Sequence, residues 1–317
     1  MGEEWRFGWH PEKIKKKKSP KRVLVVGAGP SGLEAARVLG EQGNEVILAE
    51  ATRNLGGRVI KESNLLGLAE WRRVSDWRIT QINKLSNVEI YRESELVAKD
   101  VTELNADFVM IATGAKWSED ALGRHSDTGF ETVDTNMIIG AEHVLNGEKI
   151  DGDRIVIYDD DHYYIGSVMA LELSRRGHSV VLVTPAGRAC SWGEYTDEQV
   201  PSNLALYDAN VKVITNKTII NVARGVAEAK CIYSSESIFI NCDGVIPLTR
   251  RIPSVHLYNS LITMVDNSKK HSIIKIGDAD APSHIAGAVY SGYRNAIECG
   301  ANFSSSEFYG KRENELI

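Results

Sequence analysis

The sequence contains few cysteines, and none is placed for metal or cluster binding. Only four occur in 317 residues, and no pair forms C-x-x-C or another spacing typical of zinc or iron–sulfur sites. They are Cys190, Cys231, Cys242 and Cys299. We therefore expect no iron–sulfur cluster or metal on this chain, and we interpret the four residues as buried or unreactive thiols in a reducing cytoplasm.

The sequence also lacks a long apolar run and an excess of positive charge. No stretch approaches the ~20 apolar residues that cross a bilayer, and we find no apolar core of a signal peptide near the N-terminus. The net charge is −6, so no overall field favours nucleic acid or anionic lipid. We therefore expect a cytoplasmic protein with no membrane and no nucleic-acid partner.

The N-terminal arm, 1–20, differs from the rest of the chain in composition. Trp5, Phe7 and Trp9 would be costly to solvate together, so we expect this arm to pack against another surface. The lysine run 15–18 is more typical of a solvated linker than of a nucleic-acid or partner patch.

One stretch, residues 22–50, carries the strongest functional signal. An apolar run at 23–26 predicts a buried strand, and it is followed by the pattern G-x-G-x-x-G and a helix with an apolar stripe. A second strand at 45–49 ends at Glu50, whose spacing from Gly27 suits a carboxylate that accepts hydrogen bonds from a ribose diol. The glycines permit a tight turn, close approach of a pyrophosphate and close helix packing. A strand, a glycine turn, a helix and a second strand that ends in an acidic residue follow one another in the expected order. This order predicts dinucleotide binding.

A second stretch, residues 154–184, repeats the first at a constant offset but has lost most of the glycines. The offset aligns Gly32 with Gly166, places Asp161 where Gly27 stood and places Thr184 where Glu50 stood. Three consecutive aspartates, 159–161, precede the second helix, where they would satisfy the helix dipole and repel a pyrophosphate. We therefore expect no NAD(P) at this second site.

No residues in the sequence are spaced as a nucleophilic triad, a catalytic carboxylate pair or a Cys/His pair. We interpret residues 162–164 as a packing cluster at a helix start, and Arg250 and Arg251 as solvated or interfacial. For His284 a capping or core role is favoured over ligand contact, and for Arg58 ligand contact and a surface ion pair remain equally open.

Several motifs together resemble one family of flavoproteins. They are GAGPSG with Glu50, LGGR at 55–58, EWRRVSDWR at 70–78, ATG at 112–114, YDDDHYYIG at 158–166 and GDADAPSHIAGAVYSG at 277–292. They resemble the C-terminal half of the trimethylamine, dimethylamine and histamine dehydrogenases, with 2,4-dienoyl-CoA reductase a more distant relative. The resemblance covers essentially all of residues 1–310.

The resemblance implies an α/β fold of two glutathione-reductase-like dinucleotide-binding domains, each three-layered around a central parallel sheet. The second domain would be inserted in the first. The implied division is a linker at 1–20, an FAD- or ADP-binding domain at 21–125 plus 245–317, and a degenerate NAD-binding-like domain at 126–244. The family's N-terminal flavin barrel and cluster cysteines have no counterpart here. The resemblance therefore implies a catalytic barrel with an iron–sulfur cluster, either as a separate subunit or as a missing N-terminal region, and an electron-transferring flavoprotein as a further partner.

The motifs and the resemblance together predict one adenine-nucleotide site. Its residues are Gly27, Ala28, Gly29, Pro30, Ser31, Gly32, Glu50, Ala51, Gly57, Arg58, Ala112, Thr113, Gly114, Gly277 and Asp278. In the reductase branch the ligand is FAD beside an NADPH site, and in the amine dehydrogenase branch it is ADP. The degraded second site favours ADP, although the Gly277-Asp278 motif suits FAD equally well.

Three functional classes remain open on the sequence alone. The first is the nucleotide-binding part of an amine-dehydrogenase-like flavoprotein oxidoreductase, not catalytic on its own. The second is a stand-alone FAD-dependent NAD(P)H oxidoreductase, against which Asp159, Asp160 and Asp161 argue. The third is a non-catalytic structural or interaction module with an empty pocket, against which the intact 27–50 unit argues.

Overall fold

The computed structural model describes residues 14–270 and 272–300, which form two compact units. Within this range, unit 1 comprises residues 14–60, 70–115 and 253–300, and unit 2 comprises residues 61–69 and 116–252. Most of the arm at 1–20, with its three aromatic residues, lies outside the described residues. Among the described helices, none has the length and apolar character needed to cross a membrane.

Unit 1 is built on a five-stranded parallel sheet with the order β15-β4-β1-β2-β3. Its strands are β1 (Arg22–Val26), β2 (Glu45–Ala49), β3 (Val88–Tyr91), β4 (Phe108–Ile111) and β15 (Ile273–Lys275). Its helices are α2 (Pro30–Glu41), α3 (Arg58–Glu62, whose last two residues fall in unit 2), α4 (Arg73–Ile82), α5 (Ala98–Glu103), α9 (His256–Met264), α10 (Asn267–Lys270) and α11 (Ile285–Glu298). The strand order reverses between β1 and β4, which is where open parallel sheets bind ligands.

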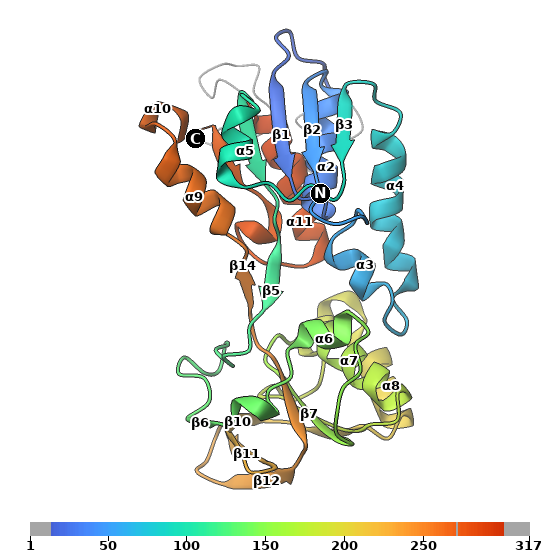
Figure 1. The fold of residues 1–317 in the computed structure, drawn as a ribbon. Helices are drawn as coiled ribbons and strands as arrows, with labels where there is room; N and C mark the ends of the chain where they lie inside the picture. Colours follow the sequence, from blue (N-terminus) through green and yellow to red (C-terminus); the bar gives the residue numbers. More distant parts are fainter. Residues whose placement is uncertain (1–13, 271, 301–317) are drawn as a thin grey trace, which may run out of the picture. The chain divides into compact units, whose positions relative to one another are not determined.

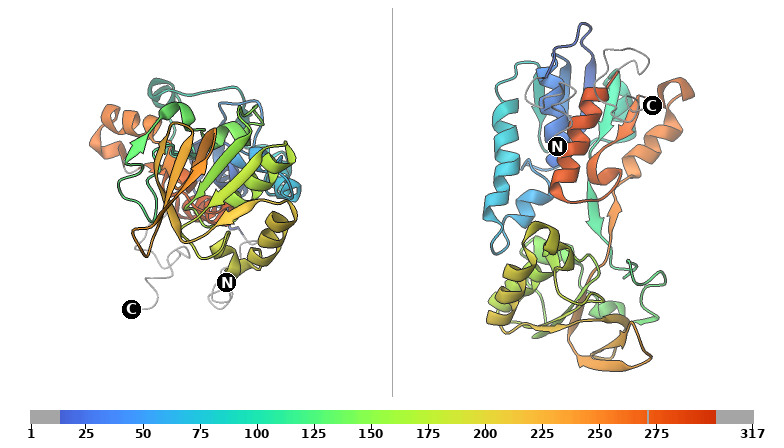
Figure 2. Two further views of the ribbon diagram at one scale, coloured as in Figure 1. Left: turned by 90° about the horizontal axis from the view of Figure 1, so that it is seen from below. Right: turned by 180° about the vertical axis from the view of Figure 1, so that it is seen from behind.

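Alternate side chains of β1 explain the three layers of unit 1. Val23 and Val25 are fully buried in one apolar cluster with residues of α2 and α11. Leu24 and Val26 point the other way, into a cluster with Val101 of α5 and residues of α9. Figure 1 shows α5 and α9 in front of the sheet, and Figure 2 (right) shows α2 and α11 covering its other face. A strand buried on both faces needs no polar alternation, and this explains its continuous apolar sequence.

Unit 2 combines a parallel sheet with an antiparallel one. The parallel sheet has the order β13-β7-β8-β9, and the second sheet has the order β12-β11-β10-β6. The strands are β6 (Thr132–Val133), β7 (Arg154–Asp159), β8 (Ser179–Val183), β9 (Lys212–Ile214), β10 (Lys217–Ala223), β11 (Val226–Cys231), β12 (Ser237–Asn241) and β13 (Gly244–Leu248). The helices are α6 (Ala141–Leu145), α7 (Tyr164–Arg175) and α8 (Gln199–Asp208). Tyr158 and Val222 belong to one apolar core between the two sheets, so a sheet covers the face that helices cover in unit 1.

Two short strands connect the units: β5 (Ala115–Trp117) and β14 (Arg251–Pro253) pair with each other. The chain therefore leaves unit 1 at residue 115 and returns at residue 253, whereas the family resemblance implied crossings at 125 and 245. The difference arises because β13 completes the parallel sheet of unit 2 beside β7, and because the loop around His125 folds onto that same sheet. The predicted α/β class with central parallel sheets is confirmed.

Candidate functional site

The fifteen predicted site residues all lie in unit 1, at one edge of its sheet. Four of its parallel strands end there: β1 leads into Gly27, β2 into Glu50, β4 into Ala112 and β15 towards Gly277. The N-terminus of α2 begins at Pro30 on the same edge. This edge is where parallel sheets hold nucleotides, because the loops after adjacent strands converge there.

The glycines allow the backbone to approach itself closely at this edge. Gly27 has a φ of +101°, and a Cβ on it would lie 2.4 Å from the carbonyl oxygen of Ala112. A Cβ on Gly32 would lie 1.9 Å from the carbonyl oxygen of Gly27. Gly29 differs, because the nearest atom to a Cβ there, apart from its own chain neighbours, would be the Cα of Gly57 at 4.0 Å. Gly27 and Gly32 are therefore needed for packing, whereas Gly29 leaves room beside the first turn of α2.

The first turn of α2 has an unused polar atom. The hydroxyl of Ser31 is buried and has no hydrogen-bond partner within the described part of the chain. Helix N-termini present unpaired backbone N–H groups and a partial positive charge, both of which suit a phosphate. The space at Gly29 and the orphaned Ser31 hydroxyl thus fit a pyrophosphate, and no residue of this first turn is acidic.

Glu50 is held by backbone donors next to the glycine turn. Its Oε2 accepts from the backbone N–H of Ala28 at 2.8 Å, and its Oε1 accepts from the backbone N–H of Thr52 at 2.9 Å. Ala51 follows Glu50 and is exposed. Glu50 Oε1 also accepts from the hydroxyl of Thr52 at 2.8 Å. A carboxylate that accepts three hydrogen bonds keeps a lone pair for a further donor, so its position suits a hydroxyl of a ribose.

Arg58 and Asp278 form an ion pair at the opposite end of the site. Arg58 Nη1 lies 3.4 Å from Asp278 Oδ2, and Arg58 Nη2 donates to the carbonyl oxygen of Ser283 at 2.8 Å. Burial raises the pKa of Asp278, and the charge of Arg58 opposes this shift. Asp278 Oδ1 accepts from the backbone N–H of Ser283 at 2.9 Å. Of the two roles left open for Arg58, the structure shows an ion pair, although a mostly buried one.

Two further predictions concern residues around this edge, and a third concerns the lysine run near the N-terminus. His284 is the N-cap of α11, where its Nδ1 accepts from the backbone N–H of Gly287 at 2.8 Å, in agreement with a capping role. Thr113 donates its hydroxyl hydrogen to the carbonyl oxygen of Ser254 at 2.6 Å, and so ties the end of β4 to the returning chain. Lys17 departs from the expected solvated linker, because burial lowers the pKa of its ammonium group, which donates to the carbonyl oxygen of Cys299.

The corresponding edge of unit 2 has a longer turn than the sequence offset indicated. The offset that aligns Gly32 with Gly166 holds for α7 and β8. It fails for β7, because Arg22 of β1 pairs with Glu45 whereas Arg154 of β7 pairs with Ser179. The second turn is therefore two residues longer. The prediction that Asp161 takes the place of Gly27 is wrong. Strand pairing sets the register at the end of β7, and by this register Asp159 takes the place of Gly27.

Asp159 packs against Gly166 in unit 2, at the position where Gly32 packs against the backbone of Gly27 in unit 1. It is fully buried, and a Cβ on Gly166 in the first turn of α7 would lie 2.4 Å from Asp159 Oδ2. Its Oδ1 accepts from the backbone N–H groups of Asp161 and His162, each at 3.1 Å. Burial, together with repulsion by Asp161, raises the pKa of Asp159 to about 7. A buried carboxyl group thus lies against the first turn of α7, near the helix end that would otherwise receive a phosphate.

A loop of unit 2 also covers this edge. Asp160 is fully buried, and its carboxylate accepts from the backbone N–H of His125 at 2.9 Å and contacts His125 Nδ1 at 2.7 Å. Arg124 lies over the ring of Trp192 at 4.1 Å, and Tyr163 meets the same ring at 5.0 Å. The ring of His162 also lies 6.2 Å from that of Trp192, so residues 162 and 163 pack together as predicted, whereas Tyr164 donates its hydroxyl hydrogen to Glu62. The loop around His125 seals the end of β7.

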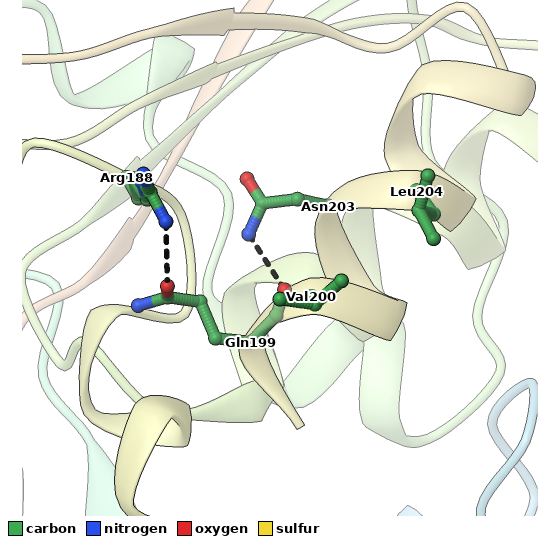
Figure 3. Close-up of a pocket in the computed structure, with 5 residues that line it drawn as sticks. All are labelled: Arg188, Gln199, Val200, Asn203 and Leu204. Atoms are coloured by element: carbon green, nitrogen blue, oxygen red, sulfur yellow. Dashed lines mark hydrogen bonds between the residues drawn. The ribbon is translucent and has the colours of Figure 1, made fainter. Parts of the chain in front are cut away.

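The structure also shows a surface pocket on unit 2 beside α8 (Figure 3). It is lined by Arg188, Gln199, Val200, Asn203 and Leu204. Arg188 donates to the Gln199 side chain at 3.3 Å, and Asn203 donates to the Gln199 carbonyl oxygen at 2.8 Å. These polar groups satisfy one another, and none of the fifteen predicted residues lies here.

Sequence reasoning missed two contributors. Ser291 of α11 accepts from the backbone N–H of Gly277 at 2.8 Å, and so fixes the turn before Asp278. His125 comes from a stretch that looked irregular, and no local pattern marks it. A serine facing a glycine turn carries no sequence signal of its own, so only the tertiary contact reveals it.

Comparison with known proteins matches two family models to successive parts of the chain. Residues 8–145 match the model for pyridine nucleotide-disulphide oxidoreductases, and residues 139–265 match the model for the second α/β domain of OYE-like proteins. Dimethylamine dehydrogenase of Hyphomicrobium sp. (strain x) is 33% identical, covering 94% of this chain and 44% of the relative.

Two solved structures agree closely with the whole chain. Histamine dehydrogenase from Rhizobium sp. 4-9 has a TM-score of 0.90 and 38% identity, covering 96% of this chain and 48% of that one. The 6-hydroxypseudooxynicotine amine oxidase of Pseudomonas geniculata N1 has a TM-score of 0.91 and 33% identity, covering 95% of this chain and 45% of that one. The chain spans about half the length of the relatives it matches. These findings confirm the resemblance read from the motifs: the chain is a close homologue of dimethylamine dehydrogenase and histamine dehydrogenase over the nucleotide-binding C-terminal half of those flavoprotein oxidoreductases.

Proposed function

We propose that this chain is the adenine-nucleotide-binding part of an amine-dehydrogenase-like flavoprotein oxidoreductase, with ADP as the preferred ligand. The observation that carries the proposal is the contrast between the two glycine turns. The turn at Gly29 is open and beside an orphaned Ser31 hydroxyl, whereas the turn between β7 and α7 in unit 2 carries the buried carboxyl groups of Asp159 and Asp160.

The proposed binding mode follows from the contacts at the sheet edge of unit 1. The pyrophosphate lies at the N-terminus of α2 over Gly29, and a ribose hydroxyl donates to Glu50, which Ala28 and Thr52 hold in place. Arg58 is ion-paired to Asp278 near the loop after β15, where it supplies positive charge to a terminal phosphate.

The choice between ADP and FAD rests on the electron supply. An FAD would add a flavin ring able to accept a hydride, and a stand-alone oxidoreductase would need a nicotinamide site to deliver it. Asp159 and Asp160 are buried carboxyl groups in the segment where β7 leads into α7, the part of a βαβ unit that holds a dinucleotide's phosphates, and carboxylates repel phosphates. ADP, which is not a redox cofactor, needs no such donor. The catalytic flavin barrel with its iron–sulfur cluster, and an electron-transferring flavoprotein, are the partners we propose for the assembly.

The test is to identify the nucleotide that the purified protein carries. The protein is denatured, and the released nucleotide is separated by chromatography and identified by mass, with visible absorbance recorded beforehand. We expect ADP and no flavin absorbance. A yellow protein that releases FAD, and whose flavin is bleached by NADH, would instead support the stand-alone oxidoreductase.

A further inference from the structure

A second cluster of polar side chains, outside the nucleotide site, has the composition of a metal centre. His125, Asp160 and His162 each offer one ligand atom, and these atoms all lie within 4.8 Å of one another. Asp160 Oδ1 lies 2.7 Å from His125 Nδ1 and 3.1 Å from His162 Nε2. All three residues belong to unit 2. The ligands come from two separate segments, the loop before α6 and the turn after β7.

Burial argues that this cluster has more than a surface role. Asp160 is fully buried and His162 is 4% exposed. A buried carboxylate normally requires a cation or several donors to offset its lost hydration. Here one carboxylate oxygen contacts two imidazoles, while the other accepts from the backbone N–H of His125. The backbone contact orients the carboxylate, as outer-shell hydrogen bonds do at known metal sites.

Two unsatisfied atoms in the same turn provide an independent observation. His162 Nδ1 and Asp159 Oδ2 are both buried, and neither has a hydrogen-bond partner among the described residues. A metal ion on His162 Nε2 would fix the proton on Nδ1 and turn it into a donor, and metal-bound histidines usually donate to a carboxylate. Asp159 carries such a carboxylate in the same turn. His162 also adopts a left-handed backbone (φ 69°), which is costly for a residue with a side chain.

We propose that His125 Nδ1, Asp160 Oδ1 and His162 Nε2 bind one divalent transition-metal ion of the zinc type. Two nitrogen ligands and one oxygen ligand favour Zn²⁺ over Mg²⁺ or Ca²⁺, which prefer all-oxygen sites. Tetrahedral ligands about 2.0–2.1 Å from zinc stand roughly 3.4 Å apart, so the side chains need only small rotations. His125 is partly exposed, which gives the ion an entry path and leaves a fourth position for water.

The ion would fasten the loop that carries His125 to the carboxyl end of β7. Arg124 already anchors this loop by stacking on Trp192, and Gly123 approaches Asp160 so closely that a Cβ there would lie 2.3 Å from its Oδ2. The unit would therefore have a structural metal site, which holds the loop to β7, in place of a lost dinucleotide site. The sequence predicted no metal on this chain, because a ligand so far along the chain from the Asp-x-His pair forms no recognisable spacing.

The test is a titration of the untagged full chain, freed of metal with a chelator, with ZnCl₂ and separately with CoCl₂. We expect one equivalent of Zn²⁺ by calorimetry and by elemental analysis after dialysis, visible absorption bands from Co²⁺, and a higher melting temperature with Zn²⁺. His125→Gln should lower the Zn²⁺ affinity by at least about 100-fold, because loss of outer-shell partners alone costs roughly 10–100-fold. Because His125 is partly exposed, this variant disturbs the core less than a change at either buried ligand.

His143→Gln is the matched control, because His143 is an exposed histidine of unit 2 that pairs with Glu148. It should bind Zn²⁺ like the unaltered chain. The proposal is overturned if the unaltered protein takes up no Zn²⁺ in stoichiometric amount, or if His125→Gln binds it with unchanged affinity. A Co²⁺ spectrum that persists in His125→Gln would likewise place the ion elsewhere.

Discussion

The two βαβ units of this chain share a backbone plan but differ at the turn between strand and helix. In unit 1 the turn is short, its glycines pack against backbone atoms, and the first turn of α2 is open. In unit 2 the turn is two residues longer, and the buried carboxyl group of Asp159 lies against the first turn of α7. The positive end of the helix dipole is thus available to a ligand in unit 1, whereas in unit 2 a carboxyl group of the chain itself lies beside it.

The third glycine shows this difference at a single matched position. Gly32 is required because its Cα lies close to the carbonyl oxygen of Gly27, whereas Gly166 is required because it lies close to the side chain of Asp159. The glycine has been kept in both units, but in unit 2 it makes room for a carboxyl group. A retained glycine therefore does not by itself indicate a retained nucleotide site.

The largest effect is expected for Gly32→Ala. Its Cβ would lie 1.9 Å from a backbone oxygen, so α2 must shift on the sheet, at a cost on the order of 1–3 kcal/mol in overpacking. Bound nucleotide should fall at least tenfold, as measured by chromatography of the denatured protein. Gly166→Ala is the control: it strains unit 2, but the nucleotide content should stay as in the unaltered chain. Equal loss in both variants would mean that the two turns do not act separately.

A second expectation concerns NADH. Because Asp159 and the loop at His125 fill the end of β7 in unit 2, NADH added to protein whose unit 1 site is saturated with ADP should show no saturable binding below about 1 mM, which corresponds to about −4.1 kcal/mol. Fluorescence titration of NADH measures this directly. Saturation at micromolar NADH would show that the second site still accepts a dinucleotide.

Replacing Glu50 with Ala should weaken nucleotide binding by roughly 1–3 kcal/mol, the cost of unpaired hydrogen-bond partners. Calorimetry on stripped protein gives the affinity, and circular dichroism checks that the turn with Ala28 and Thr52 survives. Thr184→Val alters the equivalent position of unit 2 and should leave the affinity unchanged. An unaltered affinity in Glu50→Ala would place the ribose elsewhere.

The smallest effect is on cysteine labelling. Burial raises the pKa of both Cys299 in unit 1 and Cys242 in unit 2 to about 11, so neither should react before its unit opens. Because ADP binds only unit 1 in this account, excess ADP should slow labelling of Cys299 several-fold and leave that of Cys242 unchanged. Mass spectrometry of timed samples measures both rates in one experiment, and protection of Cys242 by ADP would contradict independent opening.

The fold of unit 1 was predictable because its signals are local. The apolar run before Gly27, the glycine turn and the acid at Glu50 each occur within one βαβ unit, and the structure places all of them on one edge. The longer turn of unit 2 was not predictable from an offset, because helix alignment and strand pairing set different registers. The role of His125 depends on a tertiary contact with Asp160, and no pattern within residues 115–150 points to it.

The positions at which the chain passes between the two units could not be predicted from local sequence either. The strand at 244–248 belongs to unit 2 because it pairs with β7, which lies far away in the sequence. Local sequence predicts that a strand exists, whereas its neighbour in the sheet is decided by the packing of whole units. The boundary consequently falls at residue 253 rather than at 245.

The central claim is that one of the two βαβ units binds an adenine nucleotide and the other does not. Calorimetric titration of nucleotide-stripped protein with ADP tests it most directly, because the stoichiometry counts the sites. We predict one ADP per chain, retained in Gly166→Ala and bound at least tenfold more weakly in Gly32→Ala. Two sites per chain, or a single site whose affinity is unchanged in Gly32→Ala, would contradict this claim.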